Sequence, residues 1–422
     1  MRRSTASRST SGPYSSARIA SAAVTTVDTS RRALDLLDPE WYRAGPHGDL
    51  TWARANEPVY RDDRNELWGM TRHADVLHVE RHSEIFSSKG TYRAVAEPYE
   101  MNMIANDDPR HQQQRRLVAG RFTPRAVSDR YGDVVGAIVR ELVDTAAPRG
   151  EMEVIHDLAG QLPGRTTAHL LGLPQERWED VKGWSERLMR IDMRLRDPNV
   201  MEDLFHANVE FATEFLQIFA DRRTCPMDDL ASVWANAVID GEPLDDMTLI
   251  HEVGLFIAGG AETTRTLIAH GLRAFCDHPD QWELLAREPR RIPLAIEELL
   301  RWVTPLNNFF RTALVDTEVG GQPIAAGERV VLLYPSANRD EAVFERPFEF
   351  DVTRDPNPHL AFGNGTHFCL GANFARLSLR TVFETLTERI TNLRVVTEPD
   401  IEPNIFARAV RSFTLGFDPR PR

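Results

Sequence analysis

Lysine and cysteine are both scarce in this chain of 422 residues. Of its 50 basic residues only Lys89 and Lys182 are lysines, a bias that we attribute to genomic codon usage. The 63 acidic residues outnumber the basic ones and set the formal net charge at −13, which argues against a protein that coats nucleic acid. The chain has three cysteines: Cys225, Cys276 and Cys369. A small, odd number of cysteines argues against a disulfide framework. We therefore expect a reducing, cytoplasmic location.

Long apolar runs are absent as well. The most apolar stretch, residues 249–261, already contains His251 and Glu252, so no membrane span is expected. The first thirty residues lack the apolar segment of a secretory signal and are rich in Ser, Thr, Ala and Arg. That composition is typical of an organelle transit peptide, but a disordered N-terminal extension over residues 1–30 is the simpler expectation. One domain is then expected over residues 31–422.

Helical signals dominate the rest of the chain. Thr123 followed by Pro124 combines a capping residue with proline at the first helical position, and apolar residues recur at helical spacing from Val127 to Leu142. Three further long helices are predicted over 245–278, 293–304 and from 372 onward. Strand signals are fewer: hairpins at 58–70 and 317–324, and a β-branched run at 329–334. The predicted fold is mainly α with a minor β part, in a single large domain.

A glycine-rich loop surrounds Cys369 in the segment 362–376, FGNGTHFCLGANFAR. Glycines allow a tight loop and a close approach of a flat partner to the backbone. Amides at the start of the following helix favour a thiolate, the form of cysteine that binds metals. A zinc site would need further ligands nearby, whereas a single axial thiolate suits haem iron. We interpret Cys225 and Cys276 as small buried residues.

A second unusual segment, AGGAETT at 258–264, lies inside the helix predicted from Asp245. Two glycines in a helix interior cost about 1 kcal/mol each relative to alanine, which indicates a bend or a bulky group packed against the backbone. Glu262 and Thr263 follow them directly. A plain helix crossing with a solvated glutamate is the alternative. A third segment, Glu298 to Arg301, places opposite charges on one helix face, a weak signal alone.

Taken together and in this order, the three segments resemble the cytochrome P450 haem-thiolate monooxygenases. The cysteine loop matches the signature of that family at Phe362, Gly365, His367, Cys369 and Gly371. The resemblance covers about residues 38–419 and is closest to soluble actinobacterial members that hydroxylate steroid side chains and methyl-branched lipids. It implies the cytochrome P450 fold and haem b, iron protoporphyrin IX, as the cofactor.

The resemblance also assigns roles to residues. It implies Cys369 as the iron ligand and Glu262 with Thr263 as the proton relay to bound dioxygen. Glu298, Arg301 and Arg354 correspond to a structural triad of the family. The residues implied to bind the haem are His111, Arg115, Arg311, Phe362, Gly363, Gly365, His367 and Cys369.

The substrate pocket implied by the family topology is apolar. Asn307 and Asn308 are candidates to bind a keto or hydroxyl oxygen of the substrate. The pocket residues expected are Phe256, Ala258, Gly259, Leu306, Phe309, Phe310, Ile405 and Phe406. A steroid or branched lipid fits such a pocket, and a polyketide or terpenoid scaffold stays open as an alternative.

No dinucleotide fingerprint follows a predicted strand, so electrons are expected from a separate ferredoxin or flavodoxin with its reductase. Five arginines near the thiolate side could form a docking patch for that partner, or an ordinary solvated surface: Arg110, Arg116, Arg121, Arg376 and Arg380. The presence of Glu262 and Thr263 argues against two other interpretations, a non-catalytic haem sensor and a peroxide-driven enzyme. A haem sensor would need no proton relay, and a peroxide-driven enzyme of this fold usually replaces the pair Glu262 and Thr263.

Overall fold

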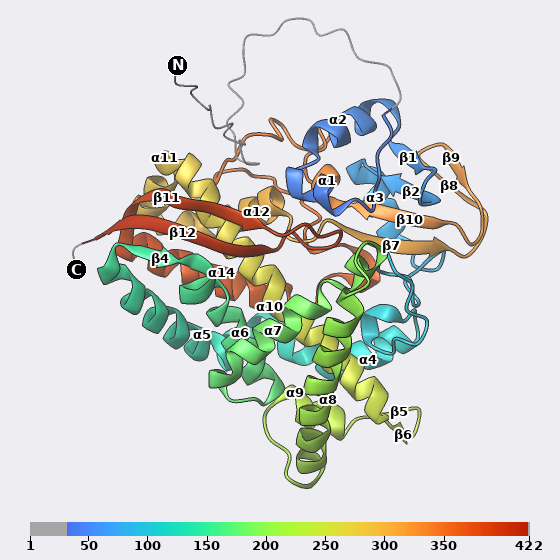
Figure 1. Cartoon of the computed structure of the whole chain (residues 1–422), viewed down its shortest axis with the longest axis horizontal. Helices are drawn as coiled ribbons and strands as arrows, with labels where there is room; N and C mark the ends of the chain where they lie inside the picture. Colours follow the sequence, from blue (N-terminus) through green and yellow to red (C-terminus); the bar gives the residue numbers. More distant parts are fainter. Residues whose placement is uncertain (1–31, 421–422) are drawn as a thin grey trace, which may run out of the picture.

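The computed structural model describes residues 32–420, and the N-terminal segment expected to be disordered lies outside this range. The described chain is mainly helical with a minor β part, so the predicted fold class is confirmed. Most of the long helices gather in one half of the molecule, together with the two longest strands, and the N-terminal helices lie with a sheet of short strands in the other half (Figure 1). The helices are α1 (Pro39–Ala44), α2 (His47–Asn56), α3 (His73–Arg81), α4 (Arg110–Ala119), α5 (Pro124–Ala146), α6 (Gln161–Leu171), α7 (Trp178–Leu188), α8 (Val200–Thr224), α9 (Leu230–Ala235), α10 (Asp246–Asp277), α11 (Pro279–Arg287), α12 (Ile292–Val303), α13 (Tyr334–Ala337) and α14 (Ala372–Arg389).

The strands form two main sheets and two small hairpins. The larger sheet has the order β1-β2-β10-β7-β3, and within it only β2 and β10 pair in parallel. The second sheet has the order β11-β12-β4 and is antiparallel throughout. The strands are β1 (Val59–Asp62), β2 (Leu67–Met70), β3 (Phe86–Ser87), β4 (Glu151–Glu153), β5 (Val238–Ile239), β6 (Glu242–Pro243), β7 (Asn308–Ala313), β8 (Thr317–Val319), β9 (Gln322–Ile324), β10 (Arg329–Leu333), β11 (Ile390–Ile401) and β12 (Val410–Pro419).

The long helices begin where their capping residues predict. The Thr123 side chain accepts a hydrogen bond from the Ala126 amide at the start of α5, and Asp245 does the same for Thr248 at the start of α10. The α10 helix ends at Asp277, immediately before the turn that leads into Pro279. Both predicted hairpins are also present, as β1–β2 and β8–β9.

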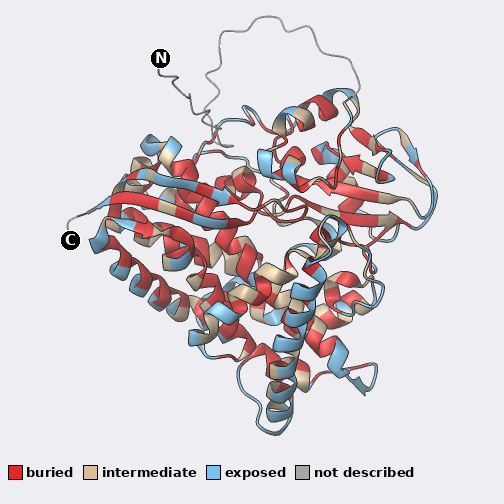
Figure 2. Cartoon of the chain, viewed as in Figure 1, coloured by how far each residue is buried: buried red, intermediate tan, exposed pale blue. Residues whose placement is uncertain are grey.

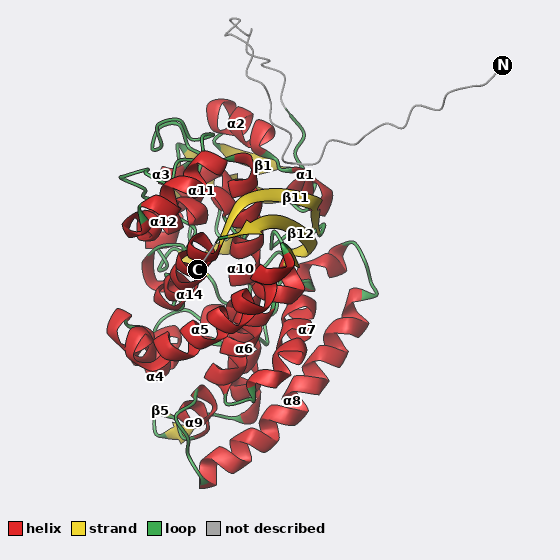
Figure 3. Cartoon of the chain, turned by 90° about the vertical axis from the view of Figure 1, so that its left-hand side faces the viewer, coloured by secondary structure: helices red, strands yellow, loops and turns green. Residues whose placement is uncertain are grey.

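The α10 helix is the central element of the helical half. It packs against α6, α7, α8 and α12, and most of its residues from Ala261 to Phe275 are buried. Figure 2 shows this buried interior, and Figure 3 shows α7 and α8 side by side along one edge of the molecule. These contacts bury the C-terminal half of α10 and leave Gly259 and Gly260, near its middle, exposed. Over residues 32–420, no helix has the length and apolar character needed to cross a lipid bilayer.

Candidate active site

A cavity of about 720 Å³ lies beside the middle of α10. Its walls come from segments that are far apart in the sequence: α4, α8, α10, β7 and the loop that precedes α14. Cys369 and Thr263 both line it, so the fold brings the two strongest motifs of the sequence to one site. The chemistry of this site therefore depends on what the cysteine loop and α10 present to the same space.

The cysteine loop is closed by its own backbone. The Cys369 amide donates to the carbonyl oxygen of Phe362 at 2.9 Å, and Gly363 adopts a φ of +65°, a conformation that favours glycine. Burial raises the pKa of the Cys369 thiol, while the backbone amide of Gly371 and the guanidinium of Arg115 oppose that shift. The backbone donor expected at the start of α14 is therefore present, although burial outweighs it.

Gly365, which the family resemblance implies as a haem-binding residue, has a packing role in this structure. Its φ is +67°, and a Cβ atom there would collide with the backbone carbonyl oxygen of Glu80 at the end of α3. Gly365 does not belong to the cavity lining. It allows α3 to pack against the cysteine loop, which places residues of α3 beside the cavity.

Two imidazoles and two guanidiniums gather at one end of the cavity. His111 and Arg115 come from α4, Arg311 from β7 and His367 from the cysteine loop, and all four line the cavity. The ring centroids of His111 and His367 are 4.3 Å apart. Within residues 32–420, the Nε2 atoms of both rings are buried and have no hydrogen-bond partner. Such orphaned buried atoms indicate a polar group that belongs between them.

The electrostatic character of this end suits an anion. Burial, together with Arg311, His111 and Arg115, lowers the pKa of His367 to about 2, so its ring is neutral. Burial likewise lowers the pKa of the Arg115 guanidinium, whose Nη2 donates to the Phe368 carbonyl oxygen at 2.6 Å. Arg311 donates to the Phe310 carbonyl oxygen at 2.7 Å. A carboxylate placed here would meet two guanidiniums.

The two glycines of α10 have separate structural reasons. A Cβ atom on Gly260 would lie 2.8 Å from the Oγ1 atom of Thr167 on α6, so this glycine permits a close helix crossing. A Cβ atom on Gly259 would meet nothing within 4 Å, because this position faces the open cavity. The plain helix crossing thus explains one glycine, and space for a bulky group explains the other.

Thr263 and Glu262 point in different directions. The Thr263 hydroxyl lies at the cavity and donates to the Gly259 carbonyl oxygen at 2.9 Å. Glu262 is buried away from the cavity lining and pairs with Arg265, which also contacts Glu186. Burial raises the pKa of Glu262, and Arg265 opposes this shift. The solvated glutamate of the alternative interpretation is therefore not found: Glu262 belongs to a buried ion-pair network whose outer members are partly exposed.

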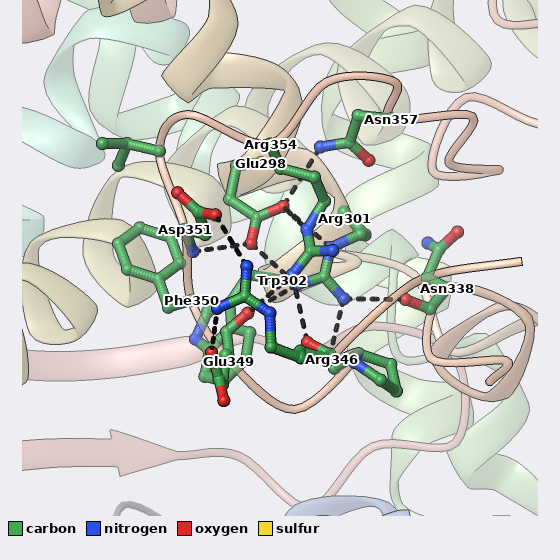
Figure 4. A network of polar contacts seen from close by, with 12 residues as sticks. Glu298, Arg301, Trp302, Asn338, Arg346, Glu349, Phe350, Asp351, Arg354 and Asn357 are labelled. Carbon is green, nitrogen blue, oxygen red and sulfur yellow. Dashed lines mark hydrogen bonds and ion pairs between the residues drawn. The ribbon is translucent and has the colours of Figure 1, made fainter.

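Glu298, Arg301 and Arg354, the residues expected to form a triad, lie close together (Figure 4). None of the three lines the cavity. Arg301 donates to both carboxylate oxygens of Glu298, at 2.8 and 2.7 Å, and Arg354 donates from Nε at 3.1 Å. The remaining guanidinium hydrogens of the two arginines reach backbone carbonyls in the segment 338–349. This network joins α12 to the long loop that leads to Cys369.

Most of the expected substrate residues form the apolar wall of the cavity: Phe256, Ala258, Gly259, Leu306, Phe309 and Phe406. The prediction is wrong for Phe310 and Ile405, which are fully buried in the core. Neighbouring residues in an extended segment face opposite sides, and here Phe309 and Phe406 face the cavity.

The prediction that Asn307 and Asn308 reach the substrate pocket is also wrong. Both are buried outside the cavity lining, and their amides bond to backbone carbonyls at 404–405.

Comparisons with known proteins identify the family of this chain. A family model described as cytochrome P450 matches residues 194–413. The chain is 38% identical over 395 residues to a steroid C26-monooxygenase of Mycobacterium tuberculosis, an alignment that covers 92% of this chain and 98% of the relative. The chain belongs to the cytochrome P450 family. It is a P450 monooxygenase, with haem b as its cofactor.

Two further relatives of this P450 act on or bind other molecules. A linalool 8-monooxygenase of Pseudomonas putida is 34% identical over 414 residues, covering 92% of this chain and 99% of the relative. A Mycobacterium marinum cytochrome P450, solved in complex with pseudoionone, has a TM-score of 0.83 and 34% identity, and the match covers 92% of this chain and all of that one. The overall fold of this P450 is therefore that of bacterial P450s.

The residues present fit a haem. The Cys369 sulfur faces the cavity, Gly363 leaves the backbone free of a side chain, and the orphaned Nε2 atoms of His111 and His367 lie where a polar edge would satisfy them. Arg115 and Arg311 supply the charge that haem propionates require.

The same end of the cavity contains two residues that the sequence did not indicate. Glu80 of α3 and Tyr334 of α13 both line it. No local pattern marks either of them, because an acid on a short amphipathic helix ordinarily faces water. The related signal in the sequence is Gly365, since a glycine allows another segment to approach the backbone closely.

Proposed function

We propose that this P450 hydroxylates the aliphatic side chain of a steroid, or of a branched lipid of similar length. The observation that carries the proposal is the shape of the cavity. From Thr263 its lining continues along α10 through Gly254 and His251 to Met247, a span of about 24 Å at 1.5 Å per residue. An elongated molecule can therefore reach Thr263 with one end while its other end remains near Met247.

The character of the lining changes along this span. Near Thr263 the wall is apolar, with Phe309 and Phe406 in edge-to-face contact at 5.1 Å. Near Met247 the wall contains polar groups, among them Asn208 and His251. An apolar side chain at the inner end and an oxygen-bearing ring system at the outer end match this arrangement. The steroid C26-monooxygenase relative supports the same orientation, because C26 lies at the tip of a steroid side chain.

The chain contributes binding, exclusion of water and proton delivery. The haem, when bound, supplies activation of dioxygen and oxidation of the C–H bond. Thr263 can both donate and accept a hydrogen bond at the cavity. Glu262 reaches the cavity only by leaving Arg265, which remains charged and cannot pass a proton on. We therefore assign proton transfer to a rotation of Glu262 between its ion pair and Thr263.

Electrons come from separate redox partners, and we propose a ferredoxin-type protein. Of the five arginines expected to form its docking patch, three are paired with acids of this chain: Arg121, Arg376 and Arg380. Arg116 instead bonds the neutral amide of Gln112. Arg116→Glu should slow reduction by an acidic ferredoxin, and an unchanged rate would place the docking site elsewhere. Three free cysteines support a cytoplasmic location.

A terpenoid substrate is the second candidate, supported by the linalool and pseudoionone relatives. Three ligand classes distinguish the two: sterols with a full side chain, steroids without one, and acyclic terpene alcohols. Each is titrated against the ferric enzyme, and the shift of the Soret band to high spin is measured. We expect the tightest binding for full-length sterols, with hydroxylation at the side chain shown by mass spectrometry. Tighter binding of the short terpene alcohols would overturn the steroid proposal.

A further inference from the structure

Glu80 is a buried acid, and only one of its two carboxylate oxygens has a hydrogen-bond partner among residues 32–420. It is 6% exposed, lies near the end of α3 and lines the cavity beside Gly363. The Tyr334 hydroxyl donates to its Oε1 atom. Within residues 32–420, its Oε2 atom is buried and has no hydrogen-bond partner. A buried carboxylate oxygen without a partner costs free energy, so the arrangement calls for one.

Glu80 shares this condition with the two imidazoles of the site. The Nε2 atoms of His111 and His367 are likewise buried, unpartnered and part of the same cavity lining. Arg311 is close enough to act on Glu80 electrostatically, and His367 lies close enough to Arg311 for the same effect. These groups converge from α3, α4, β7 and the cysteine loop on the end of the cavity that suits the haem propionates.

We propose that Glu80 is a haem-binding residue: held by Tyr334, its carboxylic acid donates a hydrogen bond from Oε2 to a haem propionate beside Arg311 and His367. Two ionised carboxylates in contact would repel each other, so one of the two must keep its proton. Glu80 keeps it, because Arg311 and Arg115 favour the ionised form of the propionate.

The surroundings of Glu80 are consistent with a protonated acid. Burial raises the pKa of Glu80 to about 7, although the Tyr334 hydroxyl, Arg311 and the backbone amide of Asn364 each lower it. Besides these groups, His367 faces the same space, and its lowered pKa keeps it neutral. A propionate next to Glu80 would raise the pKa of the acid further, since a like charge disfavours ionisation.

The proposal implies a pH dependence with a definite sign. The proton of Glu80 is needed in the haem complex, so the complex is stable below the pKa of the bound acid and weakens as the pH rises through it. The rate of haem release should therefore rise at alkaline pH in the wild type. Glu80→Gln keeps a neutral donor that cannot ionise, so its release rate should stay close to the wild-type value at neutral pH and lack the alkaline rise.

The experiment measures haem transfer from the ferric holoenzyme to apomyoglobin between pH 6 and 9. Glu80→Ala should release haem about tenfold faster at neutral pH, because a hydrogen bond to a charged group is lost. Tyr334→Phe should move the alkaline rise to higher pH, because it removes a donor that lowers the pKa of Glu80. Glu252→Gln is the matched control: Glu252 is a fully buried acid whose pKa is raised to about 8, and it lies outside the cavity lining.

Each outcome bears on the assignment. An alkaline rise that persists in Glu80→Gln, or that Glu252→Gln removes equally well, would overturn it. Urea unfolding of each variant without haem separates a general loss of stability from a specific loss of haem affinity. If Glu80→Ala does not fold, Glu80→Gln and Tyr334→Phe still decide the question through the pH profile.

Discussion

The buried triad offers the sharpest test of how this fold is held together. Glu298 has no exposed surface and accepts five hydrogen bonds, from Arg301 twice, Arg354, Asn357 and the Asp351 amide. Glu298→Ala leaves the fully buried Arg301 and the nearly buried Arg354 without a counter-charge. Breaking one partner of a buried charged pair costs about 3–5 kcal/mol. That is a large part of the roughly 5–15 kcal/mol by which a folded protein is stable.

The assay is urea unfolding followed by circular dichroism, with haem content as a second measure. Glu298→Ala should lower the free energy of unfolding by about 3–5 kcal/mol and give little soluble haem protein. Glu384→Ala is the matched control, because its pair with Arg380 lies on the surface, where such pairs contribute about 0–1 kcal/mol. A loss below about 1 kcal/mol for Glu298→Ala would refute the structural role of the triad, since surface pairs already reach that size.

Three further predictions concern the cavity. Cys369→Ser should abolish the strongly red-shifted Soret band of the reduced carbonyl complex, whereas Cys276→Ser should keep it; retention of the band in both would exclude Cys369 as the iron ligand. Thr263→Ala should keep haem and substrate binding but lower product formed per reductant consumed, up to about a hundredfold, with peroxide released instead; unchanged coupling would assign proton delivery to water or substrate. Gly259→Ala should stabilise the haem-free protein by up to about 1 kcal/mol, because its Cβ meets open space. Gly260→Ala should be less stable than Gly259→Ala by about 1–3 kcal/mol, since its Cβ lies 2.8 Å from a hydroxyl of α6; equal stability of the two variants in urea would contradict that difference.

Local chemistry determined much of the secondary structure. Thr123 with Pro124 and Asp245 with Asp246 mark helix starts, because a side-chain oxygen can satisfy the first free amides wherever the helix goes. The hairpin at 317–324 was predictable for the same kind of reason: Gly320 and Gly321 adopt positive φ at its turn. Such signals act over a few residues and do not depend on what packs against them.

The cysteine loop was also readable in the sequence, because its glycines, its thiol and the helix start lie within ten residues of one another. The pair Glu262 and Thr263 was found by its position after two glycines, but its geometry was not. That Glu262 turns away from the cavity to Arg265 depends on the packing of α10 against α7. A sequence pattern shows which residues are neighbours along a helix, but it does not show which residues of other helices they contact.

The tertiary structure alone decided the membership of the cavity wall. Phe310 and Ile405 are as apolar as their neighbours Phe309 and Phe406, yet the first two lie in the core and the other two line the cavity. Side chains alternate between the two faces of an extended segment, but the sequence does not show which face borders the cavity. Glu80 reaches the site because α3 packs on Gly365, a contact between segments 285 positions apart. The sequence by itself predicted the main elements and the cysteine loop, since these depend on neighbouring residues; Cys369 as the iron ligand stays a prediction. Which distant side chains share one buried space depends on the packing of the whole chain, and only the folded structure contains that information.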